Sequence, residues 1–258
     1  MAFRDSRNYT KFVRTIAAAA AAGDPSAEYF TAIALKYCGA NLELYFRQSD
    51  GSFRTLDEAQ VRFGILPASV LDEIVDTYDR CHEYMIDPGE KDPTSAWKSW
   101  LDRASAAGYP PAESLEADVL REAALMRDSA NTSGGNVVPP TMGPARDLAM
   151  RAVMSGDPAS ILEMSNWVDG AKHSLANSED LVAAWQLLAC RRGFDDCGSN
   201  SELLRASCNV DPQCADDSSV VDSLKRVFGT RFEDIQNLAN AIGLAIDQKN
   251  PKAVESYL

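Results

Sequence analysis

The feature that most constrains this fold is a glycine followed two residues later by a proline, found three times between alanine-rich segments. The sequence contains Gly23-Asp-Pro25, Gly108-Tyr-Pro110 and Gly156-Asp-Pro158, with Asn250-Pro251 as a weaker copy. Glycine tolerates the left-handed conformation that ends a helix, and proline suits the first position of the next helix. Each motif therefore predicts a sharp corner between two helices.

The residues around these corners predict tight αα-hairpins. Asp24 and Asp157 stand directly before a proline, where a carboxylate can accept hydrogen bonds from the free amides of the incoming helix. Small side chains on both sides of a corner allow two antiparallel helices to approach closely. These side chains are the alanines Ala18, Ala21, Ala27, Ala104, Ala107, Ala112, Ala149, Ala152 and Ala159.

The spacing of the corners predicts a helical repeat. The four prolines Pro25, Pro110, Pro158 and Pro251 are separated by 85, 48 and 93 residues, and Leu66-Pro67 falls midway through the first interval. A period of roughly 40 to 48 residues is typical of helical repeats and solenoids. We therefore expect an all-α fold built as an αα-hairpin repeat solenoid, the alternative being a plain helical bundle in which the turns coincide by chance.

Composition along the chain suggests three parts. We expect helical repeats over residues 1–127, a flexible loop rich in Gly, Ser and Pro over 128–144, and further repeats with a cysteine-rich hairpin over 145–258. The two helical parts could also form one continuous solenoid. Residues 42–54 carry aromatic residues and an Asp-Gly turn signal, which predicts either a small β-hairpin insertion or an irregular loop. Thr55-Leu-Asp-Glu58 then reads as a capping box that opens a helix.

Charge excludes one class of partner and favours another. The chain has 258 residues, a net charge of −13 and a pI near 4.6, with no basic half. Nucleic-acid binding requires clustered Lys and Arg, so we exclude it, whereas charge complementarity favours a basic protein or peptide.

No apolar run is long enough to cross a bilayer. Residues 12–22 imitate a secretory signal, but Arg14 interrupts them and they lead into the first corner, so we interpret them as the first repeat helix.

Six cysteines, an even number, predict disulfides. The last four, Cys190, Cys197, Cys208 and Cys214, lack the paired Cys-x-x-Cys spacing of common zinc sites, although reduced thiols and a metal site remain alternatives. A helix from Ser199 to Cys208 would hold its ends roughly 15 Å apart, whereas bridged Cα atoms lie within about 7 Å. This geometry favours the bonds Cys190–Cys197 and Cys208–Cys214.

A third bond, Cys38–Cys81, is predicted from the repeat. The two cysteines lie 13 and 14 residues after Pro25 and Pro67, so they occupy nearly equivalent places on adjacent second helices. Three disulfides indicate an oxidising compartment such as a bacterial periplasm, or secretion, whereas reduced cysteines would indicate the cytoplasm.

One corner carries a resemblance to a known family. The stretch Trp100-Leu-Asp-Arg-Ala-Ser-Ala-Ala-Gly108-Tyr-Pro-Pro-Ala112 resembles the core of Sel-one-like repeats, a branch of the tetratricopeptide superfamily. Residues 148–158 and 16–27 match that pattern more loosely, and residues 184–198 resemble a cysteine-bearing helix pair in exported bacterial proteins of unknown function. The resemblance implies an α-solenoid that serves as an interaction scaffold.

Residues for catalysis are sparse, so we expect a non-enzymatic protein without cofactor or metal. His82 and His173 are the two histidines and neither has a ligand spacing. We interpret His82, beside Cys81, as a helix-surface residue and not as part of a Cys/His dyad. The competing hypotheses are a hydrolase with a carboxylate-based site and a purely structural, disulfide-stapled envelope protein.

Aromatic residues near the expected hairpin are the candidate binding site. We expect Tyr37, Tyr45, Phe46 and Phe53 to form an exposed recognition patch, although ordinary packing would also explain them. The four tryptophans, which lie among Leu and Ala at helical spacing, are better explained by core packing than by a ligand box. The sequence therefore predicts a scaffold that binds another protein or a peptide in the bacterial cell envelope.

Overall fold

The computed structural model describes residues 6–65, 68–86, 93–131, 142–168, 178–194, 197–198, 203–204 and 217–258. Within these residues the regular elements are helical, and pairing between extended segments is limited to two isolated bridges. The expectation of an all-α protein is therefore confirmed for the described part of the chain. The chain divides into two compact units, residues 1–112 and 113–258, each with its own apolar core.

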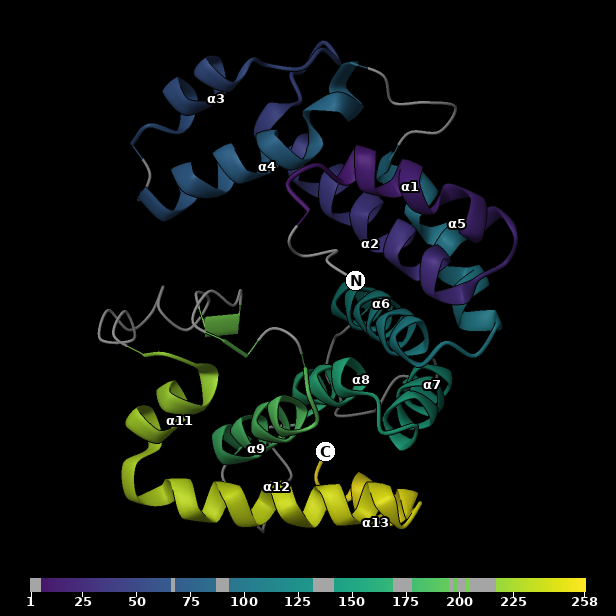
Figure 1. Cartoon of the computed structure of the whole chain (residues 1–258), viewed down its shortest axis with the longest axis vertical. Coiled ribbons are helices and arrows are strands. Elements are labelled where there is room, and N and C mark those ends of the chain that lie inside the picture. The colour runs from purple at the N-terminus through teal and green to yellow at the C-terminus, as the bar shows by residue number, and fades with distance from the viewer. Residues whose placement is uncertain are drawn as a thin grey trace. The chain divides into compact units, whose positions relative to one another are not determined.

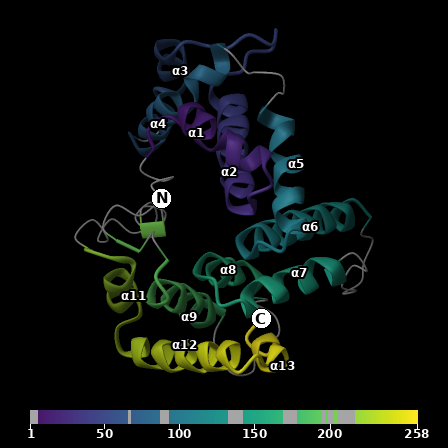
Figure 2. The ribbon, with the colours of Figure 1, turned by 45° about the vertical axis from the view of Figure 1, so that its right-hand side comes forward.

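The first unit contains three helices that pack side by side and an additional segment. Helices α1 (Tyr9–Ala21) and α2 (Pro25–Asn41) form a hairpin, and α5 (Pro93–Ala106) packs along α2 (Figures 1 and 2). Between α2 and α5 in the sequence lie the π-helical turn η1 (Leu42–Phe46) and the helices α3 (Leu56–Phe63) and α4 (Ala68–Ile86). Helix α4 packs against α1 and α2, and α2 stays in direct contact with α5.

This order differs from the one that a linear solenoid predicts, in which each helix pair stacks between its neighbours along the chain. The second predicted pair, α3 with α4, lies outside the row formed by α1, α2 and α5. Two features account for its position. Helix α3 has eight residues and buries a single side chain, Ala59, and a disulfide holds α4 to α2. The interval of 85 residues between Pro25 and Pro110 is therefore long because the chain leaves the row and returns.

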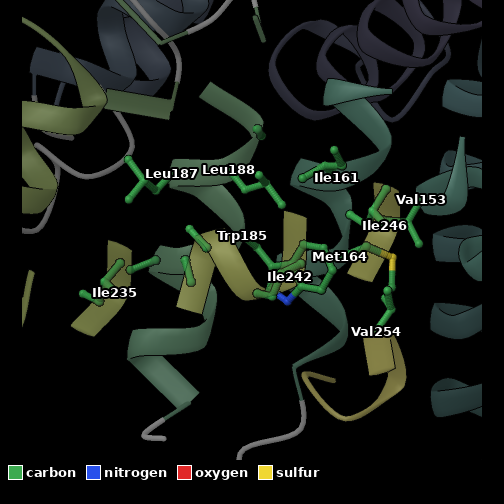
Figure 3. Close-up of a cluster of buried hydrophobic side chains, with 14 of the residues drawn as sticks. Val153, Ile161, Met164, Trp185, Leu187, Leu188, Ile235, Ile242, Ile246 and Val254 are labelled. Atoms are coloured by element: carbon green, nitrogen blue, oxygen red, sulfur yellow. The ribbon is translucent and has the colours of Figure 1, made fainter. Parts of the chain in front are cut away.

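The second unit consists of helices that pack around an apolar core centred on Trp185. Its elements are α6 (Pro110–Asn131, which begins just before the boundary), α7 (Met142–Met154), α8 (Pro158–Glu163), η2 (Met164–Trp167), α9 (Ser178–Arg191), α11 (Val220–Phe228), η4 (Gly229–Arg231), α12 (Phe232–Asp247) and α13 (Pro251–Glu255). Helices α8 and α12 both pack on α9, and α13 packs on α12. The large fully buried side chains of this core come from α7, α8, η2, α9, α12 and α13 (Figure 3), and α6 adds the fully buried Ala117.

The boundaries differ from those expected from composition. The division falls at Ala112, inside α6, and this helix runs from Pro110, just after the corner at Gly108, to Asn131. Residues 128–131 and 142–144, expected in a loop, belong to α6 and α7. The remainder of the expected loop, 132–141, lies outside the described residues.

All four predicted corners join consecutive helices. Gly23, Gly108 and Gly156 have φ values of 86°, 75° and 86°, and Lys249 occupies the corresponding left-handed position with φ 52° before Pro251. At Gly108 the amide of Tyr109 donates to the carbonyl of Ala104 and the amide of Gly108 to that of Ser105, which is the pairing of a Schellman helix end. The corner thus satisfies carbonyl groups that would otherwise have no partner.

The caps predicted from sequence are also present. Asp24 accepts a hydrogen bond from the amide of Ala27 at 2.8 Å, and Asp157 accepts one from Ser160 at 2.9 Å. Thr55 and Glu58 form the complete capping box of α3. The expected β-hairpin near 42–54 is reduced to one antiparallel bridge between Arg47 and Phe53, and its first residues belong to η1 instead.

Replacing Gly108 tests the corner directly. A Cβ at this position would meet no atom within 4 Å, so the substitution Gly108→Ala changes only the cost of the left-handed backbone. We expect it to lower the free energy of unfolding by about 1 kcal/mol, measured by urea denaturation followed by circular dichroism. The control is Gly143→Ala in the first turn of α7, also in open space but without positive φ, which should be neutral or stabilising. Equal effects of the two changes would contradict the role of the corner.

Candidate functional site

The predicted aromatic patch is not exposed as a unit. Phe46 is fully buried and Tyr45 is 7% exposed, both within the core of the first unit. Phe46 packs against the ring of Tyr78 with centroids 5.9 Å apart, and Tyr45 meets Phe63 edge-on at 5.8 Å. The expectation of an exposed patch is therefore wrong for these two residues. The physical reason is η1, because its wide π-helical turn directs Leu42, Tyr45 and Phe46 into the core.

The other two candidates, Tyr37 and Phe53, are half-buried and lie in different surroundings. Phe53 sits beneath the guanidinium of Arg47, whose centre is 4.4 Å from the ring centroid. Tyr37 instead meets Tyr9 edge-on at 5.4 Å and donates a hydrogen bond from its hydroxyl to Asp76 at 3.1 Å. The four predicted residues therefore contribute to packing and to a polar cluster.

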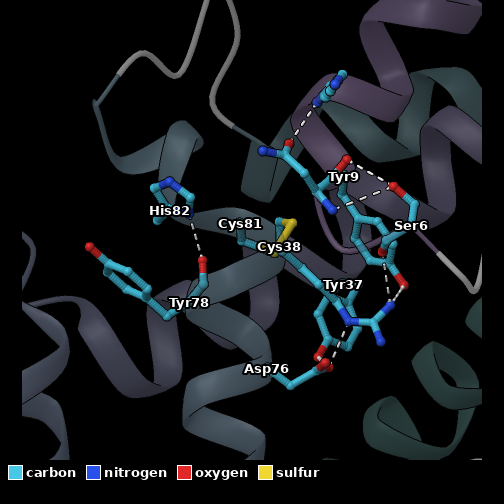
Figure 4. Close-up of a disulfide and its surroundings, with 11 residues drawn as sticks. Ser6, Tyr9, Tyr37, Cys38, Asp76, Tyr78, Cys81 and His82 are labelled. Carbon is cyan, nitrogen blue, oxygen red and sulfur yellow. Dashed lines mark hydrogen bonds and ion pairs between the residues drawn. A yellow bond between two sulfur atoms is a disulfide. The ribbon is translucent and has the colours of Figure 1, made fainter.

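This polar cluster lies beside the disulfide Cys38–Cys81 in the first unit (Figure 4). Arg80 of α4 donates to Asp76 at 2.7 Å and to the hydroxyl of Tyr9 at 2.9 Å. The carboxylate of Asp76 thus accepts from both Arg80 and Tyr37, which ties α4 to α2, while Tyr9 adds α1. Arg80 and Asp76 were not among the predicted site residues, although their spacing of four residues on one helix is a recognisable ion-pair signal.

Burial fixes the protonation state of the phenols in and near this cluster. Desolvation raises the pKa of Tyr37 far above its ordinary value, although the neighbouring Thr77 hydroxyl opposes this shift. Desolvation likewise raises the pKa of Tyr84 to about 12. Both hydroxyls are therefore neutral at physiological pH and can only donate or accept hydrogen bonds. These two phenols therefore take part through hydrogen bonding and packing and stay protonated near pH 7.

His82 lies close to the cluster, but the cysteine next to it has no free thiol. Its Nδ1 lies 2.9 Å from the carbonyl oxygen of Tyr78, one turn earlier on α4, and its ring stacks on the Tyr78 ring. Cys81, its neighbour, is bonded to Cys38, so the two residues cannot act as a Cys/His dyad. His173, the other candidate, lies outside the described residues.

Two of the three predicted disulfides are present. Cys38–Cys81 joins α2 to α4 with Cα atoms 5.4 Å apart, and Cys190–Cys197 joins the end of α9 to the following loop with Cα atoms 5.6 Å apart. Cys208 and Cys214 lie outside the described residues. Two disulfides indicate an oxidising location outside the cytoplasm.

The tryptophans pack as predicted. Trp185 is fully buried in the second core, Trp167 packs against that core, and Trp97 and Trp100 pack against the first core. Among the described residues, no three His, Cys, Asp or Glu side chains converge in a way that could hold a metal ion.

Comparisons with known proteins do not assign the chain to a family. The chain matches no protein-family model, and searches of curated proteins and of solved structures gave no significant match. The resemblance to Sel-one-like repeats therefore stays a prediction from the residues around Gly108. None of the helices in the described ranges combines the length and apolar character that a membrane span requires.

The two disulfides should differ in their contribution to stability. Chain entropy predicts that removing Cys38–Cys81, whose sequence separation is 43, costs about 4 kcal/mol, whereas removing Cys190–Cys197, with a separation of 7, costs about 2.5 kcal/mol. The double variants Cys38→Ala/Cys81→Ala and Cys190→Ala/Cys197→Ala, compared by urea denaturation, test this order. A larger loss in the second variant would contradict it.

The buried phenol of Tyr84 should make stability fall at alkaline pH. An unfolded tyrosine loses its proton near pH 10, whereas in the folded protein the pKa of Tyr84 is about 12. The contribution of the buried Tyr84 phenol to the free energy of unfolding is therefore fully present below pH 10. It is lost as the pH rises towards 12. Tyr84→Phe should reduce the decline of the free energy of unfolding between pH 10 and 12. Identical declines in the variant and the wild type would show that Tyr84 does not contribute.

Proposed function

We propose that the chain is a non-enzymatic helical-repeat scaffold that binds another protein or a peptide in an oxidising compartment. The observation that carries this proposal is a pair of ion pairs at equivalent positions. Glu28 lies five residues after Gly23 and binds Arg103, which lies five residues before Gly108, at 2.5 Å. Glu113 lies five residues after Gly108 and binds Arg151, which lies five residues before Gly156, at 3.1 Å.

These pairs support a repeating architecture because each follows the same rule. In each pair, the glutamate lies on the helix that follows one corner. The arginine lies on the helix that precedes the next corner in the series Gly23, Gly108 and Gly156. The carboxylates are nearly buried, with Glu28 3% and Glu113 11% exposed, so each depends on its arginine for charge compensation. Recurring contacts between successive repeats are the defining property of solenoids, whose surfaces commonly bind proteins and peptides.

The carboxylates with shifted pKa values favour a scaffold over the hydrolase alternative. The pKa values of Asp50 and Asp222 are lowered, in each case first by hydrogen bonds from serine hydroxyls. Ser52 acts on Asp50 in the turn after η1, and Ser218 and Ser219 act on Asp222 in the first turn of α11. These are local turn and cap interactions. A hydrolytic site needs two groups with opposed protonation tendencies at one place.

The disulfides and the charge refine the proposal. Two disulfides suit the periplasm or an extracellular space, and the resemblance to exported bacterial proteins points the same way. The net charge of −13 favours a basic partner.

A competition experiment tests the proposed function. The oxidised chain is immobilised and exposed to a native periplasmic or secreted extract, and retained proteins are displaced with excess untagged chain. We expect at least one intact protein to be displaced and, after purification, to bind saturably at micromolar or lower concentration. The control bait is the same chain reduced and alkylated in urea. Retention of nothing that the untagged chain displaces would favour a purely structural role, and release of fragments of the retained protein would favour the hydrolase.

A further inference from the structure

Helix α2 packs against α1, α4 and α5, yet one of its sides is only half-buried. This side carries Tyr29, Ile33 and Lys36, at intervals of four and three residues, which places them in one line along the helix. Two further half-buried residues, Phe30 and Tyr37, border this line and pack their rings on α1. The opposite side is buried and consists of Ala27, Glu28, Thr31, Ala32, Ala34, Leu35, Cys38 and Gly39. Burial therefore divides α2 into a core side and a side that a partner can reach.

Two aromatic rings from outside α2 extend this half-buried side into one continuous surface. The ring of Tyr109 lies with its centroid 5.4 Å from that of Tyr29. At the other end of the line, the ammonium of Lys36 lies 5.5 Å from the ring centroid of Trp97 on α5. Both outer residues are half-buried as well. We refer to Tyr29, Ile33, Lys36, Trp97 and Tyr109 together as the α2 face.

The pairing of a cation with an indole recurs at the equivalent position in the second unit. Lys36 lies 13 residues after Gly23, and Arg121 lies 13 residues after Gly108. The guanidinium of Arg121 is 5.6 Å from the ring centroid of Trp167. A contact that returns in register with the corners belongs to the repeating architecture.

The two cation sites differ in the residue three positions before the cation. In the second unit this residue is Asp118, whose carboxylate accepts a hydrogen bond from Arg121 at 2.6 Å. In the first unit the same position holds Ile33, and no carboxylate of the described residues forms an ion pair with Lys36. The second unit thus shows which group completes a cation on an indole, and the first unit lacks that group. A carboxylate from a partner fits this place, and Ile33 offers an apolar contact beside it.

The local charge favours such a carboxylate. Helices α1, α2 and α5 hold five basic and two acidic residues, which gives +3. One of the two acidic residues, Glu28, is 3% exposed and is bound to Arg103. Interactions between exposed charges fade beyond about 8 Å at physiological salt. The groups within reach of Lys36 therefore matter more for docking at the α2 face than the net charge of −13.

We propose that the α2 face docks a short segment of a partner protein in which a carboxylate lies next to an apolar side chain. The carboxylate binds Lys36, and the apolar side chain packs on Ile33 and Tyr29. This inference rests on the proposed scaffold function and names the surface and the chemistry of the docking segment. A partner that is basic as a whole, as the net charge favours, still places a carboxylate at this point.

The probe for this proposal is a short fluorescein-labelled peptide with blocked ends, in which one glutamate stands between leucines and the other residues are serines. Three comparators replace the glutamate by glutamine, the glutamate by lysine, or the leucines by serine. Binding to the full-length oxidised protein is measured by fluorescence anisotropy. We expect a micromolar Kd for the glutamate peptide and several-fold weaker binding of each comparator. The lysine peptide is the sharpest comparator, because the net charge of the chain alone would favour it.

Variants of the chain locate the binding surface. Lys36→Gln should abolish the preference for the glutamate peptide over the glutamine peptide. Ile33→Asp should abolish it as well, because an aspartate three residues before Lys36 copies Asp118 and pairs with the ammonium. The matched control is Lys98→Gln, which removes an exposed lysine of α5 and should leave the preference unchanged. Circular dichroism and urea midpoints show whether each variant is folded, and Lys36→Gln alone decides the test if Ile33→Asp is not.

Several outcomes would overturn the proposal. They are an unchanged preference in Lys36→Gln, an equal loss in Lys98→Gln, binding of the lysine peptide as tight as that of the glutamate peptide, and self-association of the wild type in sedimentation equilibrium that Lys36→Gln abolishes. The competition experiment separates this proposal from the scaffold function. A displaced partner that binds Lys36→Gln with unchanged affinity would leave the scaffold function standing and show that the location is wrong. A preference that depends on Lys36, found without any displaced partner, would do the reverse.

Discussion

Both compact units depend on one local constraint, which is that a helix must end and the next must begin within about three residues. The left-handed residue turns the chain, the amides after it satisfy the last carbonyls, and the following Asp or Asn caps the next helix. Cations from elsewhere in the same unit complete these helix ends. Arg103 donates to the carbonyl of Ala20, and Lys249 to that of Met154. The negative ends of α1 and α7 are thereby compensated.

The segment between α2 and α5, residues 42–86, shows how a chain can leave a series of stacked helices without losing its core. Cys38–Cys81 fixes α4 against α2, and Arg80 links the same helices to α1 through Asp76 and Tyr9. Helix α3 buries only Ala59, while its Leu56 and Phe63 pack partly against the core of the first unit.

Features that depend on a few neighbouring residues were predictable from the sequence. The corners at Gly23, Gly108 and Gly156, the caps at Asp24 and Thr55, and the short-range bond Cys190–Cys197 follow from local conformational preference and chain length. The candidate aromatic patch was not predictable in the same way. Whether Tyr45 and Phe46 face water or the core depends on the π-helical turn that carries them, and no local signal in the sequence marks that turn.

The sequence by itself determined an all-α chain with sharp corners, because glycine, proline and capping side chains act on their immediate backbone. The tertiary structure decided which helices become neighbours. It placed α5 on α2, paired Glu28 with Arg103, and left Val61 and Ile65 exposed. Such contacts join residues far apart in the chain, and their formation depends on which apolar faces bury each other best. That choice is made by the whole core, which a pattern of neighbouring residues does not specify.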